Sequence, residues 1–326
     1  MERGTIADTG THVIACAWDR TNAAFGLGDG TVLIGGARVA AHDGAVLALA
    51  AHPAGGFVSG GDDGRLLWID GAAVTVLSTH GMRWVEQVAT FADAKTTLIA
   101  AAVGKRVFLT DGAGVALKTF EHPTTVTGLA FDTRGKRLAA SHYNGASLWF
   151  VASKTDNPRR LEWKGSHTGI AVAPDGDAVV TSMQENALHG WRLSDGQHMR
   201  MSGYPAKTAA LGFTRSGKWL ASSGAESIVL WPFSGGGPMG KAPTELGGGD
   251  PDVMCTQVAC HPLQETVAAG FSDGTVILAD IASGRILPVS GPGRGPVSAM
   301  AWSATGAWLA FGTEAGTTAV IDFTAR

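Results

Sequence analysis

One repeated pattern limits the fold of this chain more than any other feature of its sequence. The clearest copy is VLALAAHPAGGFVSGGDDGRLLWID at residues 46–70. VLALA and GFVSG are typical of two short strands joined by the turn HPAGG, and GDDG leads into a third strand, RLLWID. Gly, Pro, Asn and Asp supply the backbone conformations that tight hairpins require. The pattern predicts short antiparallel strands joined by hairpins.

Eight copies of this three-strand pattern follow one another at a spacing of about forty residues. The copies occupy residues 13–34, 46–70, 84–111, 126–151, 167–193, 208–233, 256–280 and 297–323. Segments between copies, such as GGARVAA, GVALKTF and residues 158–164, supply a fourth strand to the copy before them. No such segment follows the last copy.

This period predicts an all-β fold, a β-propeller of four-stranded antiparallel blades. Eight copies favour eight blades; a ring of seven, with an irregular first unit, is the alternative. Residues 5–9 precede the first copy and have no other partner, so we expect them to become the outer strand of the last blade and close the ring. The period continues without a linker, which predicts one domain over residues 1–326.

Composition and charge narrow the class of function. A formal net charge of −3 without a basic stripe disfavours nucleic acid as a partner. The N-terminus lacks a signal-peptide pattern, and no apolar run reaches about eighteen residues, so we expect a cytoplasmic protein that does not bind a membrane. Cys16, Cys255 and Cys260 occupy apolar strand positions without metal-ligand spacing, which favours buried thiols over a disulfide or a zinc site. We expect no cofactor and no metal.

The repeats resemble the WD40-repeat propeller family over essentially the whole chain. That family carries a Gly-His pair before the first strand of a repeat and a Trp-Asp pair at the end of the third. The first half of this signature is preserved as His42-Asp43-Gly44, His80-Gly81 and His122. The second half drifts, as in Ile69-Asp70 and Trp191-Arg192.

The resemblance implies hydrogen-bonded pairs within a blade, formed by a histidine before the first strand and a polar residue in the later turn. His42 with Asp63, and His122 with Asn144, occupy the matching positions. A buried imidazole and a carboxylate each need a partner to offset desolvation, so such a pair would lock the turn. Asp273 lacks a matching histidine, and we expect it to cap its own glycine turn.

The sequence offers little support for catalysis. His42, His80 and His122 are explained by their place in the repeat, and the chain contains no HExxH or HxH motif. An enzyme or small-molecule binder that uses the central channel is the alternative function. The innermost strands, such as LALAA, TGLAF and IAVA, disfavour it because they offer small apolar groups.

We therefore expect a non-catalytic scaffold that presents loops to a protein or peptide partner, as the family resemblance implies. The loop before the first strand of a blade and the turn between its second and third strands should emerge on one face. Exposed aromatic and arginine side chains are the usual anchors of an interface. Trp84 has a second interpretation, in which it fills the valine position of the first strand. The candidate contact residues on this face are Arg83, Trp84, His142, Tyr143, Gln184, Glu185, Tyr204, Lys207, Glu226 and Arg294.

Overall fold

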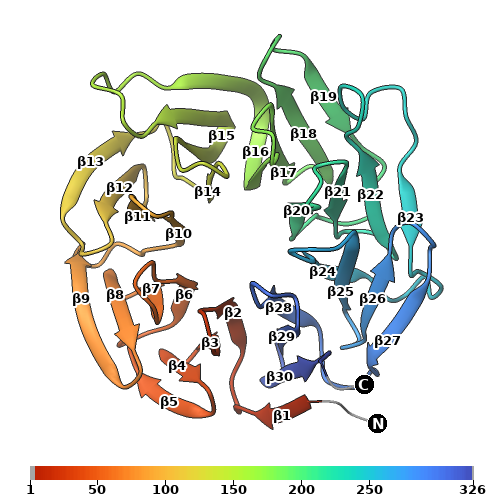
Figure 1. Ribbon diagram of the computed structural model, residues 1–326, viewed down its shortest axis with the longest axis horizontal. Coiled ribbons are helices and arrows are strands. Elements are labelled where there is room, and N and C mark those ends of the chain that lie inside the picture. Colours follow the sequence, from red (N-terminus) through yellow and green to blue (C-terminus); the bar gives the residue numbers. More distant parts are fainter. Residues whose placement is uncertain (1–3, 325–326) are drawn as a thin grey trace.

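The computed structural model describes residues 4–324, and this part of the chain runs once around a ring of short antiparallel sheets (Figure 1). Residues 1–3 and 325–326 of the predicted domain lie outside the described residues. Regular structure in the described part is β, as the repeated hairpin pattern predicts.

Each copy of the sequence pattern supplies successive strands, numbered along the chain. The first three copies form β2 (Val13–Trp18), β3 (Ala23–Leu27), β4 (Thr31–Ile34) and β5 (Ala37–Ala40); β6 (Val46–Ala51), β7 (Phe57–Gly61), β8 (Arg65–Asp70) and β9 (Ala73–Thr79); and β10 (Gln87–Ala92), β11 (Thr97–Val103), β12 (Arg106–Asp111) and β13 (Ala116–Glu121). The next two form β14 (Gly128–Phe131), β15 (Arg137–Phe150), β16 (Arg159–Val172), β17 (Ala178–Met183), β18 (Ala187–Arg192) and β19 (His198–Met201). The last three form β20 (Leu211–Phe213), β21 (Trp219–Ser222), β22 (Ile228–Pro232) and β23 (Thr244–Leu246); β24 (Cys255–Cys260), β25 (Thr266–Phe271), β26 (Val276–Asp280) and β27 (Ile286–Ser290); and β28 (Val297–Trp302), β29 (Trp308–Thr313) and β30 (Thr317–Asp322).

The preferred count of eight separate blades is wrong. Within residues 4–324 the strands form seven hydrogen-bonded sheets, of which six have four strands and one has six. The six-stranded sheet holds the fourth and fifth copies, because β16 is one strand of 14 residues that pairs with β15 along its first half and with β17 along its second. Only Gly165 and Ser166 separate the two strands predicted there, and in the structure they continue the extended chain.

The alternative of seven blades has the right number for a different reason. The seven-blade prediction assumed that the first copy packs irregularly. In the structure the first copy forms a regular four-stranded sheet in the order β2-β3-β4-β5. The reduction arises instead at the shared strand β16.

The N-terminal strand closes the ring, as predicted. Strand β1 (Gly4–Asp8) pairs antiparallel with β30, with Gly4 opposite Ile321 and Asp8 opposite Thr317. Thr9 extends this contact, since its backbone N–H and its hydroxyl both donate to the Gly316 carbonyl, at 2.9 and 2.8 Å. The last sheet therefore has the order β1-β30-β29-β28 and joins the two ends of the chain.

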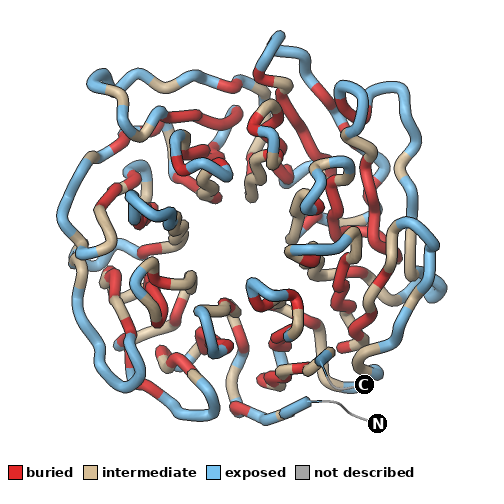
Figure 2. Tube along the Cα trace, in the orientation of Figure 1, coloured by how far each residue is buried: buried red, intermediate tan, exposed pale blue. Residues whose placement is uncertain are grey.

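The hydrophobic core lies between neighbouring sheets, and the middle strands carry most of it. Every residue of β3, β7 and β17 is buried, because sheets on both sides cover these strands (Figure 2). The exposed residues lie mainly in the loops and in the outer strands. This explains why the middle strands of the sequence pattern are apolar at consecutive positions.

A valine at the start of an inner strand packs into a gap left by a glycine in the neighbouring sheet. A Cβ at position 26 would lie 2.6 Å from Val46 Cγ1, and a Cβ at position 312 would lie 2.2 Å from Val13 Cγ1. Both distances are too short for a real contact, so the valines occupy space that only glycine leaves free. Two further junctions repeat this arrangement, with Val85 against Gly60 and Val297 against Gly270.

Candidate functional site

The loops between copies and the turns within them meet on one face of the ring, as predicted. The backbone N–H groups of His42, His80 and His122 donate to carbonyls of the turns that precede them, at Gly30, Gly64 and Lys105, over 2.8 to 3.0 Å. We call the surface formed by these loops and turns the loop face. It comprises loops 41–45, 80–86, 122–127, 202–210, 247–254 and 291–296, and turns 28–30, 62–64, 104–105, 184–186, 224–227, 272–274 and 314–316. At the fourth and fifth copies the equivalent positions, residues 143–145 and 164–168, lie within the long strands β15 and β16.

His42 and Asp63 form the predicted pair at the second sheet. His42 Nδ1 lies 2.9 Å from Asp63 Oδ1, and His42 Nε2 lies 2.9 Å from Ser59 Oγ. Burial alone would raise the pKa of Asp63, but hydrogen bonds from the Arg65 backbone, from His42 and from Asp43 lower it to about 2. The ionised Asp63 can only accept, so the imidazole donates from Nδ1 and accepts from Ser59 at Nε2.

The second pair does not form. His122 Nε2 instead accepts a hydrogen bond from the indole N–H of Trp149 at 3.0 Å. Asn144 adopts a positive φ of 67°, and its Oδ1 accepts from the Gly165 N–H at 3.2 Å. Asn144 therefore stabilises the passage from β15 to β16 rather than the loop that contains His122.

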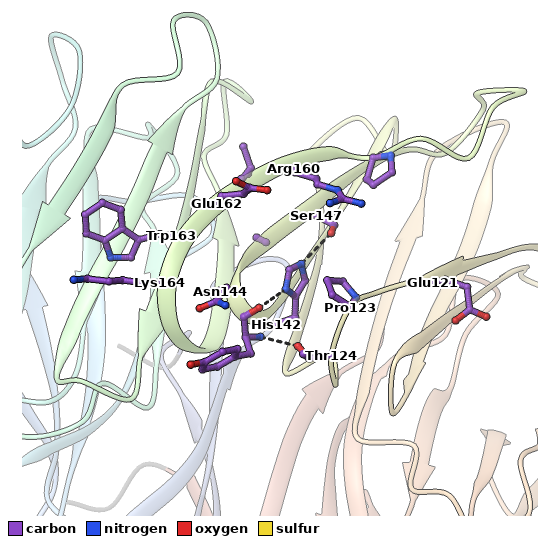
Figure 3. Close-up of a pocket in the computed structure, with 14 residues that line it drawn as sticks. Glu121, Pro123, Thr124, His142, Asn144, Ser147, Arg160, Glu162, Trp163 and Lys164 are labelled. Atoms are coloured by element: carbon purple, nitrogen blue, oxygen red, sulfur yellow. Dashed lines mark hydrogen bonds between the residues drawn. The ribbon is translucent and has the colours of Figure 1, made fainter.

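A pocket of about 520 Å³ opens beside this turn, between the end of β13 and strands β15 and β16 (Figure 3). Its wall is fixed by hydrogen bonds: His142 Nε2 lies 3.0 Å from Ser147 Oγ, and His142 Nδ1 lies 2.9 Å from the Tyr143 carbonyl, to which it donates. The backbone N–H of Tyr143 donates to Thr124 Oγ1 at 3.0 Å. Both imidazole nitrogens are thus hydrogen-bonded within the wall of the pocket.

Arg160 gives the pocket a positive charge. Its guanidinium points into the pocket above Ser147 in Figure 3, and it forms no ion pair within residues 4–324. Glu121, on the opposite wall, is neutralised by Arg106 at 2.6 Å. The pocket therefore presents Arg160 and Lys164, with the single acid Glu162 beside them, next to Pro123 and the exposed Tyr143 ring.

Trp84 is exposed, so its alternative interpretation as a core residue is wrong. The side chain is 55% exposed, whereas Val85 is fully buried in the cluster that joins the second and third sheets. The Val85 N–H donates to the Gly61 carbonyl at 3.0 Å, which fixes Val85 in the valine position and leaves Trp84 on the loop face.

Two other candidate residues are buried. Tyr204 is 8% exposed and packs into the core, where its hydroxyl lies 2.6 Å from Ser222 Oγ and accepts from Trp231 Nε1 at 2.7 Å. His142 is 6% exposed. Neither offers contact area, because each satisfies its polar groups internally. The remaining candidates are exposed, at Arg83, Tyr143, Gln184, Glu185 and Lys207, or half-buried, at Glu226 and Arg294.

The loop face has a basic half and an acidic half. The candidate contact residues were predicted one by one from the sequence, and they did not reveal this division. Loops, turns and the equivalent positions between residues 80 and 210 carry the cations Arg83, Lys105, Lys164 and Lys207 against the acids Glu86 and Glu185. We call this part the basic half. The remaining loops and turns carry Arg294 against many acids: Asp29, Asp43, Asp62, Asp63, Glu226, Asp250, Asp252, Asp273 and Glu314. Sequence reasoning also missed Met82, which is 90% exposed between Gly81 and Arg83.

The cysteines are packing residues in the structure. All three thiols are free, and burial raises the pKa of Cys255 and of Cys260 to about 12. Within residues 4–324, no cluster of three or more His, Cys, Asp or Glu side chains is arranged to hold a metal ion. The described part of the chain also has no helix with the length and hydropathy needed to span a bilayer.

Histidines inside the six-stranded sheet and beside it are held neutral. Burial, together with the neighbouring His142, lowers the pKa of His122 to about 4. Burial, with His198 and His167 nearby, lowers the pKa of His189 to about 3, and its Nε2 lies 2.9 Å from His198 Nδ1. Trp163 stacks on His189 with ring centroids 4.0 Å apart.

These depressed pKa values predict a loss of stability in acid. In the unfolded chain the histidine pKa is about 6.5, so below that pH the unfolded state binds more protons than the folded state. The contribution of His122 is complete above about pH 6.5 and is lost as the pH falls toward 4, by on the order of 3 kcal/mol. Urea unfolding at a series of pH values measures this loss. His122→Gln should flatten the dependence, and an unchanged pH profile in that variant would contradict the assignment.

Asp63→Ala should cost about 1–3 kcal/mol of unfolding free energy, because it leaves the buried His42 without its acceptor. Asp273→Ala is the matched control. Asp273 accepts from the backbone and hydroxyl of Thr275 at 2.8 Å, which caps its own turn as predicted. Chemical denaturation should show a smaller loss at Asp273; equal losses would mean that the histidine contributes nothing beyond the turn.

Comparison with known proteins supports the fold. The family model for the WD domain, G-beta repeat, matches residues 37–70, which include β6 to β8 and the His42–Asp63 pair. No curated protein sequence matches the chain. A crystal structure of the computationally designed Ika8 protein is similar, with a TM-score of 0.73 and 20% sequence identity over 97% of this chain and 98% of that one. The resemblance to the WD40-repeat propellers is therefore confirmed: residues 37–70 are a WD40 repeat, and the described chain is a β-propeller.

Proposed function

We propose that this protein is a non-catalytic scaffold that binds a protein or peptide partner on the basic half of its loop face. WD40 propellers commonly mediate protein interactions. The observation that carries the proposal is a group of exposed anchors: Met82 and Trp84 on loop 80–86 are 90% and 55% exposed, and Tyr143 is 54% exposed. Large exposed apolar groups beside cations are typical of interface anchors.

Hydrogen bonds hold these anchors in neighbouring positions around one turn. The loop with Trp84 continues to Glu86, whose N–H donates to the Ala102 carbonyl just before turn 104–105. On the other side, the Val126 N–H donates to the Gly104 carbonyl. The loop with Trp84 and the loop before Tyr143 thus flank the same turn, which adds Lys105 between them.

The charge of this region favours an acidic partner. Arg83, Lys105 and Arg160 form no ion pair within residues 4–324, so a carboxylate on a partner would replace only water. Arg160 is suited to a carboxylate because the guanidinium can donate two parallel hydrogen bonds. The partner segment that fits this surface carries an acidic residue for the pocket and an apolar residue for Trp84 or Tyr143.

The proposal predicts which substitutions weaken the partner. Arg83→Ala and Tyr143→Ala should each weaken binding by about 1–3 kcal/mol while leaving the melting temperature unchanged, because both side chains are exposed. Added salt should weaken wild-type binding as well, since the contact depends on exposed charges. The measurement is quantitative binding of a partner first isolated with the wild-type protein.

Arg134→Ala is the matched control, because Arg134 is an exposed arginine in a first-hairpin turn, on the opposite face. Binding should be unaffected by this substitution. A partner that tolerates Arg83→Ala and Tyr143→Ala but is lost with Arg134→Ala would show that the opposite face binds.

A further inference from the structure

We propose that Asn144 is a site of spontaneous deamidation, and that this modification places a carboxylate in the wall of the pocket beside β15 and β16. Its effect on binding rests on the proposed function, whereas the chemical step does not. The chain has four asparagines, at positions 22, 144, 157 and 186, and Asn144 alone is followed by glycine.

The reaction uses only the chain itself and water. The backbone nitrogen of Gly145 attacks Cγ of Asn144, a C–N bond closes a succinimide ring, and Nδ2 leaves as ammonia with the proton that the backbone nitrogen gives up. Water then opens the ring at either carbonyl, which leaves aspartate or isoaspartate. Both products carry a carboxylate in place of the amide, and nothing is oxidised or reduced. A side chain on the following residue hinders the attack, and glycine has none.

The fold keeps glycine at position 145. Gly145 has a φ of 134°, and a Cβ there would lie 2.1 Å from the Leu161 carbonyl oxygen. A larger residue would therefore force the backbone to move. The register between β15 and β16 also shifts between Tyr143 and Gly145, so Asn144 lies opposite no residue of β16 and is less constrained than in a regular ladder.

The side chain of Asn144 is open to the reaction. Asn144 is exposed at the pocket (Figure 3), and its Oδ1 accepts from the Gly165 N–H at 3.2 Å. Within residues 4–324, Nδ2 donates to no protein group, so no protein contact opposes the loss of ammonia.

Asn186, in the corresponding turn of the fifth copy, provides the contrast. It has a similar positive φ of 50°, but its Nδ2 donates to the Pro205 carbonyl at 3.3 Å. The residue that follows it, Ala187, is buried and carries a Cβ. The same backbone conformation therefore occurs twice, and Asn144 alone combines it with glycine and a free amide nitrogen.

Aspartate at position 144 is compatible with the fold. Aspartate, like asparagine, is among the residues that tolerate a positive φ. Its carboxylate can accept from the Gly165 N–H as the amide oxygen does. The new charge therefore appears in a folded protein.

This charge changes the balance of the pocket. Arg160 and Lys164 line it with Glu162, while Glu121 is paired with Arg106. A second carboxylate beside Glu162 equals the two cations, so an acidic partner segment no longer meets an excess of positive charge. Deamidation of Asn144 thus lowers the affinity of the basic half for such a partner.

Peptide mapping by mass spectrometry, after incubation of the folded protein at mildly alkaline pH, tests the chemical step. The peptide with Asn144 should gain the mass of an amide-to-acid conversion. Asn22, Asn157 and Asn186 are the internal controls and should keep their amides. Ion-exchange chromatography should show a new acidic species that the Asn144→Asp protein does not form. An Asn144 that stays an amide, or converts no faster than Asn186, would overturn the proposal.

Binding of a fluorescent peptide of alternating glutamate and leucine, which carries the acidic and apolar groups that the surface fits, tests the effect. Asn144→Asp should weaken this binding about fivefold, the effect of one exposed ion pair. Circular dichroism and thermal melting confirm that the variant is folded. Deamidated wild type, purified by ion exchange, is the second sample and should bind equally weakly.

The two failures are distinguishable. Modified protein that binds the peptide as the wild type does, while Arg83→Ala binds it weakly, would overturn the effect on binding and leave the proposed function intact. A wild type that does not bind the peptide, or binding that Arg83→Ala and Tyr143→Ala leave unchanged, would contradict the proposed function and with it the effect on affinity. The conversion of Asn144 is measured without any partner.

Discussion

The contact between a buried valine and a glycine gap joins one sheet of this propeller to the next. Val46 fills the space beside Gly26, and Val13 fills the space beside Gly312, where the last sheet meets the first. All four valines in such contacts are 0% or 1% exposed. Each contact brings two sheets closer than side chains on both would allow, so the core at these four junctions is closely packed.

The same valines determine where the loop face lies. Each ends a loop between copies, so fixing Val85 against Gly60 also fixes Arg83 and Trp84 on the surface. Hydrogen bonds from these loops to the preceding turns, and the His42–Asp63 pair, then hold the loops in place. The ring thus presents exposed aromatic and basic side chains that its own packing does not use.

The sequence predicted the architecture well because each copy repeats the same local rules. Hairpin turns, apolar middle strands and the missing fourth strand of the last copy led to the propeller and to its closure by β1. It could not show that β16 runs unbroken between two copies, because the two residues there are compatible with either a turn or an extended chain. It also left Trp84 ambiguous: Trp84 and Val85 are adjacent apolar residues, and a shift of one residue decides which is buried. Tyr204 looked like a contact residue because nothing in the sequence reveals that Trp231 and Ser222 bind its hydroxyl.

The most direct test of the account is a double-mutant cycle at the junction that closes the ring. Gly312→Ala should destabilise the protein by roughly 1–3 kcal/mol, because the new methyl group meets Val13. In a Val13→Ala background the same substitution should cost much less, since the space is then free, so the two losses should not add. Urea unfolding of the four proteins measures the coupling. Additive losses would show that the valine does not occupy the glycine gap, and would contradict the account of how the sheets are joined.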